Sequence, residues 1–367
     1  MAAFTAKDVQ ALREKTGVGM MKCKEALVAS DGDMEKAIDF LKEKGLAQAQ
    51  KKASRIAAEG VVLAYYDEAA KVGVLVEVNS ETDFVAKNEK FKNFVNSIAK
   101  TIVAENPADV DALNNTKLVD DDKTVEELRQ ELVLSIGENM KVRRFERVEG
   151  DMASYIHGGG TVGVLVLFNT DAATAAKDEF KAMGKNVAMQ VAAMSPEYLG
   201  QDEISDDELA KMKNIIVESS LNKPETLPKP ILMGLFKKAV DEKLFSDEDI
   251  AAYEEQKNNK FLFNFLSKDA VEVLAKLAVE GKEEYVANKI FAGATDGRLK
   301  KQLKEICLLE QPFVRTDLFE GSVGGYIAKV AKDLGADIKA VKFLRYAKGE
   351  GLQKREDNFA DEVASMM

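Results

Sequence analysis

An internal duplication constrains the fold of this 367-residue chain more than any other feature of its sequence. The apolar run Val-Gly-Val-Leu-Val occupies residues 72–76 and recurs at residues 162–166. The likeness continues in the same order along both copies, with one residue deleted between run and helix. The matched positions are Asn79 with Asn169, Phe91-Lys92 with Phe180-Lys181, Ala99 with Ala188 and Pro107 with Pro196. Self-similarity of this kind indicates one supersecondary unit that occurs twice.

Each copy is predicted to form a strand, a turn and a helix. A continuous apolar run opened by a valine and a glycine is typical of a well-buried strand. In the first copy another apolar segment, residues 61–65, precedes the run and predicts a hairpin with it. After Pro312, alternation at Ile338, Val341, Phe343 and Arg345 predicts the strand that completes the second copy. The fold class is therefore predicted to be α+β, with core subdomains at 56–150 and at 151–200 joined with 311–348.

The rest of the chain is predicted to be helical. The first 45 or so residues indicate a three-helix module, with Thr5 as N-cap and Asp8 in the capping-box position. With a solvated helical linker it spans residues 1–55. Residues 201–310 carry helical apolar patterns between prolines and predict an inserted arm, whose apolar faces fit packing within the chain or between two copies. The C-terminal module, residues 349–367, is predicted to be a short amphipathic helix with Phe359 and Val363 on one side.

Composition narrows the classes of function. A net charge of −11 argues against direct nucleic-acid binding, which requires concentrated Lys and Arg, and favours protein partners. The two cysteines, Cys23 and Cys307, fit neither a disulfide framework nor a cysteine-rich metal site, so we expect the reducing cytoplasm as the location. We expect neither export nor membrane insertion, because the N-terminal residues show no basic region followed by an apolar stretch and no run of about 18 apolar residues occurs.

The sequence has few of the residues and motifs that catalytic sites require. His157 is the one histidine of the chain, which excludes any site that needs two imidazoles, such as the H-E-x-x-H zinc helix. Neither G-x-S-x-G nor G-x-x-x-x-G-K-[ST] occurs in the sequence. We therefore predict that the chain is not an enzyme, has no catalytic or metal-binding residues and uses no cofactor.

The duplication provides an internal control for the turn between strand and helix. The first copy has Ser-Glu-Thr-Asp-Phe-Val at residues 80–85, whereas the second has Thr-Asp-Ala-Ala-Thr at 170–174, without an aromatic residue. The shared fold therefore does not require Phe84. One interpretation is that Thr82 or Asp83 caps the helix and Phe84 packs as a hydrophobic staple. The other is that Phe84, beside Asp83, is an exposed anchor that fills a pocket of a partner.

Three further motifs allow more than one interpretation. The glycines of residues 158–163 match G-x-G-x-x-G, but they precede a strand, which favours a hairpin turn over a dinucleotide site. Met20 and Met21 suit either core packing or an adaptable docking surface. Arg143 and Arg144 suit either an anion site or solvated strand residues, and we interpret them as solvated strand residues.

Taken together, several segments resemble the bacterial elongation factor Ts family. Residues 15–27 read Lys-Thr-Gly-Val-Gly-Met-Met-Lys-Cys-Lys-Glu-Ala-Leu, and residues 82–87 read Thr-Asp-Phe-Val-Ala-Lys. Segments in the same order as in that family are Ile136-Gly137-Glu138-Asn139, His157-Gly158, Lys348-Gly349-Glu350-Gly351, Phe359-Ala360 and Val363-Ala364. The helical region at 200–310 is longer than the dimerisation arm usual in the family.

The resemblance implies a guanine-nucleotide exchange factor for the GTPase elongation factor Tu. It implies that the N-terminal module is similar to ubiquitin-associated domains, and that Thr82, Asp83, Phe84 and Val85 enter the GTPase near its nucleotide and disturb the Mg²⁺ environment. The other partner contacts that it implies are Leu12, Met20, Met21, His157, Gly158, Phe359 and Val363. It also implies a homodimer through the arm as one form of assembly. The competing hypotheses are a nucleotide-binding protein or small enzyme that uses the turn at 158–163, and a scaffold that oligomerises through the arm.

Overall fold

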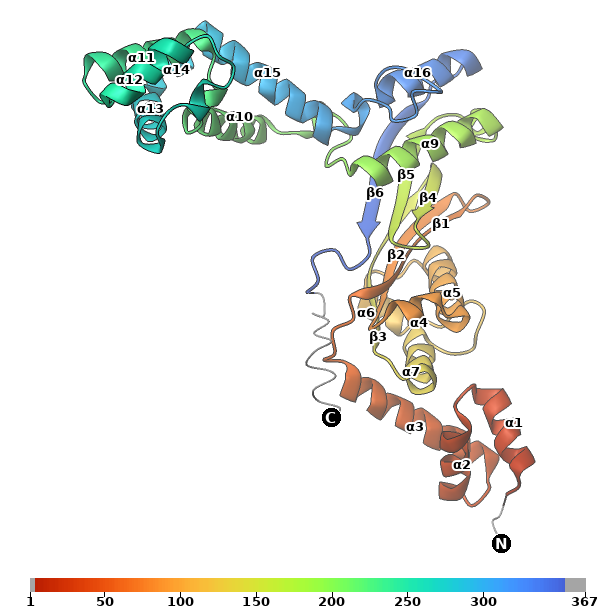
Figure 1. The fold of residues 1–367 in the computed structure, drawn as a ribbon. Helices are drawn as coiled ribbons and strands as arrows, with labels where there is room; N and C mark the ends of the chain where they lie inside the picture. Colours follow the sequence, from red (N-terminus) through yellow and green to blue (C-terminus); the bar gives the residue numbers. More distant parts are fainter. Residues whose placement is uncertain (1–3, 354–367) are drawn as a thin grey trace. The chain divides into compact units, whose positions relative to one another are not determined.

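Two units divide the chain, and the computed structural model describes residues 4–353 of it. Within those residues the first unit comprises 4–195, 313–320 and 325–353, and the second comprises 196–312 and 321–324. Sheets lie in the first unit, and the second is built from helices (Figure 1). The mixture of separate helices and antiparallel sheets agrees with the predicted α+β class.

Both sheets of the first unit have three antiparallel strands, with one copy of the apolar run at the centre of each. The first sheet has the order β1 (Glu59–Asp67), β2 (Val72–Ser80), β3 (Met140–Glu149). The second has the order β4 (Asp151–His157), β5 (Val162–Asn169), β6 (Lys339–Ala347). The predicted hairpin of the first copy is confirmed as β1 with β2, and the predicted late strand is confirmed as β6 beside β5.

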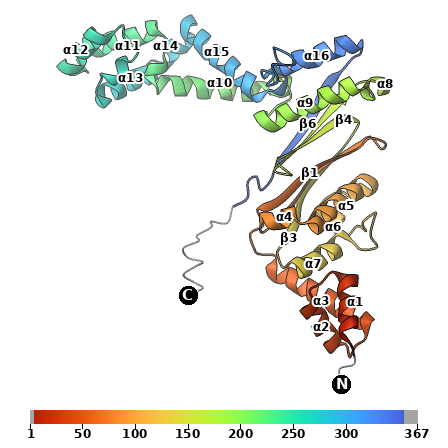
Figure 2. The ribbon, with the colours of Figure 1, turned by 45° about the vertical axis from the view of Figure 1, so that its right-hand side comes forward.

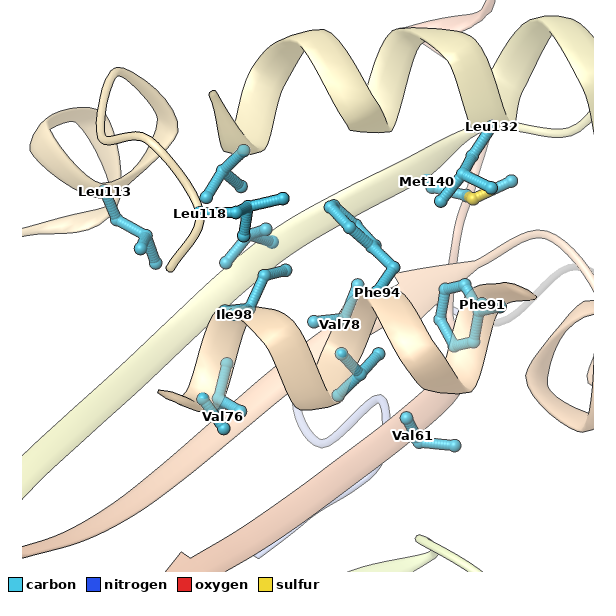
Figure 3. Packing of buried hydrophobic residues seen from close by; sticks show 14 of the residues in the cluster. Val61, Val76, Val78, Phe91, Phe94, Ile98, Leu113, Leu118, Leu132 and Met140 are labelled. Carbon is cyan, nitrogen blue, oxygen red and sulfur yellow. The ribbon is translucent and has the colours of Figure 1, made fainter. Parts of the chain in front are cut away.

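A long helix follows each central strand. Helix α5 (Glu89–Glu105) contacts β1 and β2, and α9 (Asp178–Met194) contacts β4 and β5. Each helix ends at a residue with left-handed backbone, Asn106 or Ser195, directly before the matched prolines of the repeat. Figure 3 shows Phe94 and Ile98 of α5 beside Val76 and Val78 of β2 in the core of the first copy.

Smaller helices complete the first unit. These are α4 (Asp83–Lys87), α6 (Val110–Asn114), α7 (Val125–Ile136) and α8 (Ala172–Ala175), together with most of α16 (Val323–Leu334). Helix α7 adds Leu132 and Val133 to the core under α5. The side chain of Asn186 on α9 donates a hydrogen bond to the Tyr326 hydroxyl of α16 at 3.1 Å.

The two sheets pack against each other through the faces opposite their helices (Figure 2). Val62 and Leu75 of the first sheet share a core with Leu165 of the second. A methyl group on Gly163 would lie 2.6 Å from Cγ1 of Val62 and 2.9 Å from Cδ1 of Leu75, and one on Gly73 would collide with the Met152 sulfur. The glycine of each repeat therefore permits the close approach, and burial on both faces explains why the runs are continuously apolar.

A β-bulge interrupts both sheets at the same point of the repeat. In the first, Glu77 faces Arg144 and Val78 faces Val142, so Arg143 is the extra residue of β3. Because a bulge breaks the alternation of side chains, both arginines reach Glu77, at 3.0 Å and 2.7 Å. The prediction that Arg143 and Arg144 are solvated strand residues is therefore wrong. They neutralise a carboxylate that is fully buried.

Three helices form the N-terminal module, as predicted: α1 (Ala6–Thr16), α2 (Met20–Ala29) and α3 (Met34–Lys52). The capping box is confirmed, since Asp8 accepts hydrogen bonds from the backbone and hydroxyl of Thr5. The linker prediction is partly wrong, because α3 continues to Lys52 and packs on α7 with Ala49 buried. A hydrogen bond of 2.6 Å from Nζ of Lys22 to the carbonyl of Leu134 also joins module and core.

The second unit contains the region predicted as an inserted arm. Its helices are α10 (Asp206–Leu221), α11 (Lys229–Asp241), α12 (Asp247–Gln256), α13 (Lys268–Glu280), α14 (Lys282–Ala287) and α15 (Lys289–Ile306). They enclose a core of their own, which includes Leu221, Leu235, Phe236, Leu274 and Phe291. Within residues 4–353, none of the helices has the length and apolar character needed to cross a bilayer.

The sheet contact makes a prediction about Gly163. Gly163→Ala should lower the free energy of unfolding by about 1–3 kcal/mol, because the new methyl group overpacks the interface against Val62 and Leu75. Urea denaturation followed by circular dichroism measures the change. Gly19→Ala is a control in the same unit, since nothing lies within 4 Å of a methyl group there. An unfolding free energy unchanged in Gly163→Ala would contradict this account of the repeat.

Candidate functional site

An exposed aromatic ring marks the turn between β2 and α5. Helix α4 begins at Asp83, and Phe84 in its first turn is 78% exposed, whereas the next residue, Val85, is 4% exposed and belongs to the core. Neighbouring positions of a helix point in different directions, so burial of Val85 turns Phe84 outward. The interpretation of Phe84 as a hydrophobic staple is therefore wrong. Its exposure is the property that the anchor hypothesis requires.

The base of this turn is braced by the segment between α7 and β3. The Thr82 backbone N–H donates to one oxygen of Glu138 at 3.0 Å, and its hydroxyl donates to the other at 2.8 Å. The backbone N–H of Asn139 donates to Glu81 at 2.6 Å. Thr82 is the N-cap residue of α4, one of the two predicted positions, but its side chain makes no capping hydrogen bond. Instead, Thr82 fastens the turn to Glu138.

Glu138, Asn139 and Glu81 were missed as site residues in the sequence. Their roles depend on contacts between segments that lie more than fifty residues apart. The run Ile-Gly-Glu-Asn at residues 136–139 was the one sequence feature that pointed to these residues, and it did so only through the family resemblance. Residue type alone gave no reason to place this run beside Phe84.

A charge accompanies the exposed ring. The Asp83 carboxylate accepts a hydrogen bond from Nζ of Lys87 at 2.6 Å, and this bond, with the charges of Lys87 and Lys348, outweighs desolvation and lowers the pKa of Asp83. Nζ of Lys87 lies 5.8 Å from the centroid of the Phe84 ring. At neutral pH the turn therefore presents an apolar ring beside a carboxylate that stays ionised.

The second copy builds the equivalent turn without these features. There Asp171 caps α8 by accepting a hydrogen bond from the Thr174 N–H at 2.9 Å, and only alanines follow it on the outer side. The fold thus closes this turn with a conventional cap. The exposed ring, its charged neighbour and the Glu138 brace are additions of the first copy.

The remaining predicted contacts lie on other parts of the described chain. Met20 and Met21 open α2 and are 41% and 77% exposed, so neither is a core residue. Leu12 is completely buried in the N-terminal module, packed with Leu27. It serves folding, and we correct its prediction as a partner contact. Phe359 and Val363 lie outside the described residues.

His157 ends β4, and the glycines after it form the turn to β5. The His157 side chain and Gly158 are exposed, and the Tyr155 hydroxyl lies 3.2 Å from Nδ1 of His157. The Gly160 N–H closes the turn on the His157 carbonyl at 3.2 Å. The predicted hairpin turn is confirmed. A dinucleotide site needs the glycines to open a helix, whereas here they open a strand.

The structure does not gather the predicted residues into one pocket. Phe84 and Asp83 lie on α4, Met20 and Met21 on α2, and His157 at the end of the second sheet's hairpin. All three surfaces belong to the first unit. Across residues 4–353, no cluster of three or more His, Cys, Asp or Glu side chains is arranged to hold a metal ion. Separate exposed contacts on one unit are typical of a surface that binds a large partner.

Comparison with known proteins identifies the family. The family model described as Elongation factor TS matches residues 81–350, from the exposed turn to the segment after β6. The chain belongs to the elongation factor Ts family. It is 39% identical over 366 residues to Elongation factor Ts of Clostridium perfringens strain SM101, with 99% of both chains covered. It is 40% identical over 369 residues to Elongation factor Ts of Clostridioides difficile strain 630, with 100% of both covered.

A third relative, Elongation factor Ts of Clostridium kluyveri strain NBRC 12016, is 40% identical over 365 residues, covering 98% of this chain and 97% of that protein. Likeness at this level extends through both sheets and through the helical second unit. Membership of the elongation factor Ts family makes this chain a translation elongation factor.

The brace of the turn makes a second prediction. Glu138→Ala removes the acceptor of both Thr82 hydrogen bonds, so the free energy of unfolding should fall by about 1–3 kcal/mol and the Thr82 amide should exchange faster with solvent. Hydrogen exchange read by mass spectrometry measures the second effect. Glu179→Ala, at an exposed position of α9, serves as a control. Unchanged protection of residues 81–84 in Glu138→Ala would contradict the bracing role.

Proposed function

We propose that the chain binds elongation factor Tu in its GDP-bound form and promotes release of GDP, so that GTP can replace it. The reaction belongs to translation and is placed in the cytoplasm. The observation that carries the proposal is Phe84, an exposed ring on a braced turn beside the ionised Asp83. A few anchor residues supply most of the binding energy at protein interfaces, and aromatic side chains such as Phe are enriched there.

The turn formed by Thr82, Asp83, Phe84 and Val85 is proposed to enter the GTPase near its nucleotide. In such GTPases a Mg²⁺ ion bridges phosphate oxygens and protein ligands, so a change in the support of that ion weakens GDP binding. Phe84 supplies the wedge and Asp83 a negative charge next to it. Val85 packs in the core and holds the turn in place. The hydrogen bonds to Glu138 keep the turn from changing its conformation when Phe84 contacts the GTPase.

No covalent step is required of this chain. Binding of the factor and binding of nucleotide are coupled, and the coupling is reciprocal. If the factor weakens GDP by a given ratio, nucleotide weakens the factor by the same ratio, so incoming GTP releases the factor. The proposed activity is therefore exchange without catalytic residues or a cofactor of its own.

Further contacts to the GTPase are proposed at exposed residues of the same unit. Met20 and Met21 offer flexible apolar side chains that adapt to a docking surface. The hairpin turn at His157 and Gly158 is proposed to reach a second part of the GTPase. Phe359 and Val363, beyond the described residues, are proposed to grip the nucleotide-binding domain.

The central prediction concerns Phe84→Ala. The variant should slow stimulated GDP release at least ten-fold, because loss of an interface anchor costs about 2 kcal/mol or more. The unfolding free energy should change by less than about 0.5 kcal/mol, because the ring is exposed. Release of fluorescent GDP from elongation factor Tu measures the rate. Val119→Ala, which truncates another exposed apolar side chain, is the control.

Two results would count against the proposal. If Phe84→Ala stimulated GDP release at the same rate as the unchanged chain, the proposed role of Phe84 in exchange would be refuted. Binding of NAD or GDP to the isolated chain at micromolar concentration would instead favour a nucleotide-binding protein that uses the turn at 158–163.

A homodimer through the helical second unit is proposed as well. Phe261 and Phe265 are 68% and 50% exposed there, on either side of Leu262, which is buried in the core of that unit. Isolated exposed apolar residues are common, but paired exposed phenylalanines are typical of interfaces.

Light scattering tests the dimer. The unchanged chain should have twice its chain mass of 40.3 kDa in solution, and the double variant Phe261→Ser with Phe265→Ser should have the mass of one chain. The double variant should keep the circular dichroism spectrum of the unchanged chain, since the two rings are exposed. A single-chain mass for the unchanged protein at micromolar concentration would refute the dimer.

A further inference from the structure

A buried carboxylate in the first sheet fastens a segment from the far end of the chain. Glu77 on β2 is completely buried and accepts hydrogen bonds from four residues. Asn79 and Arg143 donate to it at 3.1 Å and 3.0 Å, Arg144 at 2.7 Å, and the backbone N–H of Gly349 at 2.8 Å. Glu77 and Gly349 are separated by 272 positions in the sequence.

The same arginines extend the connection along the C-terminal segment. Arg143 donates to the carbonyl oxygen of Glu350 at 2.5 Å, and Arg144 donates to the Glu350 carboxylate at 3.2 Å. Lys348 pairs with Glu59 of β1. The segment 347–350 is thus held by charges on all three strands of the first sheet.

Gly349 fits this arrangement by its backbone. Its φ is +67°, a conformation that residues with a side chain rarely adopt. A methyl group at this position would collide with the carbonyl oxygen of Ala58. Gly351 has a similar φ of +74°, but a methyl group there would have its nearest neighbour 3.9 Å away, at Arg143. An alanine at either position would therefore have the same backbone strain, but only at Gly349 would its methyl group collide with a neighbour.

The second copy of the repeat shows that the fold does not need the carboxylate. The position equivalent to Glu77 is Leu167, and β6 has its bulge at the same place, with Val341 as the extra residue and Lys342 opposite Leu167. Burial of a charge costs free energy that apolar packing does not, even when the charge is well paired. The same fold therefore accommodates an apolar residue at this position, and the buried carboxylate is specific to the first copy.

The fastened segment lies close to the exposed turn. Glu59, the partner of Lys348, is paired across the sheet with Ser80, and the Ser80 hydroxyl donates to the carbonyl of Thr82 at 2.9 Å. The charge of Lys348 also contributes to the lowered pKa of Asp83. The segment at 347–350 is therefore attached at the same end of the sheet as the turn that carries Phe84.

We infer that Glu77 is a positioning residue, which fixes residues 347–350 beside the base of the turn at 82–85. The segment 347–350 then supports the base of the turn that carries Phe84, and exchange by Phe84 depends on that attachment. This inference rests on the proposed function for its second half. Its first half, the attachment of residues 347–350 by Glu77, concerns this chain alone.

Hydrogen exchange on the full-length chain tests the attachment. In the unchanged chain the backbone amide of Gly349 should be protected from exchange with solvent. Gly349→Ala and Glu77→Leu should each raise the exchange rate of the amide at position 349 at least ten-fold. The amides of β5 should keep their exchange rates in both variants. Gly351→Ala is the matched control and should retain the protection at Gly349. An unprotected Gly349 amide in the unchanged chain, or full protection in Gly349→Ala, would overturn the inference.

Stimulated GDP release tests the coupling, with labelled GDP bound to elongation factor Tu. Gly349→Ala should raise the concentration of full-length factor that gives half-maximal release about ten-fold, with Gly351→Ala within two-fold of the unchanged chain. In a full-length chain that carries Phe84→Ala, Gly349→Ala should have less than a two-fold further effect, because the residue that the segment positions is already truncated.

The outcomes separate the two proposals. An equal ten-fold loss from Gly349→Ala in both backgrounds would overturn the coupling while leaving the exchange function intact. Failure of the unchanged chain to stimulate GDP release would overturn the exchange function together with the coupling. The attachment of residues 347–350 would in that case still be judged by hydrogen exchange alone.

Discussion

The contact between the two sheets is the constraint on which the first unit depends. Each central strand is covered by a helix on one face and by the other sheet on the opposite face. Gly73 and Gly163 leave room for this double burial, since a methyl group at either would meet a side chain of the opposing sheet. Because both strands are locked in this way, the turns that follow them start from fixed points. The braced turn of Phe84 can therefore be rigid although it projects into solvent.

The sequence predicted those features that depend on neighbours along the chain. The apolar runs, the hairpin of β1 with β2, the late strand β6 and the N-terminal capping box all follow local patterns, and the structure has them. The misplaced residues depend on distant partners. The local sequence allows Phe84 to be a hydrophobic staple, but burial of Val85 directs Phe84 into solvent. The local sequence also allows Arg143 to face solvent, but the bulge in β3 directs it toward Glu77. Nothing near these residues in the sequence specifies such partners.

The two copies of the repeat divide the work of the molecule. The second copy closes its turn with the Asp171 cap and has Leu167 at the position of Glu77. A side-chain cap stabilises a helix, and an apolar residue avoids the free-energy cost of burying a charge. The first copy instead exposes Phe84, pairs Asp83 with Lys87 and buries a charge. These features of the first copy go against local structural preferences, and the second copy shows that the fold does not need them. Such features are expected at functional sites. In this chain those features lie at one end of one sheet, on and directly after its central strand β2.

The order of the strands also has a consequence for synthesis. Strand β5 ends at Asn169, but its second partner, β6, begins only at Lys339, after the whole helical unit. While the chain emerges from the ribosome, one edge of β5 has no strand to pair with, and unpaired edges are sites of mispairing. The intervening helices have a core of their own and are able to fold during this interval. The second half of the duplicated core therefore closes last, when almost the entire chain has been made.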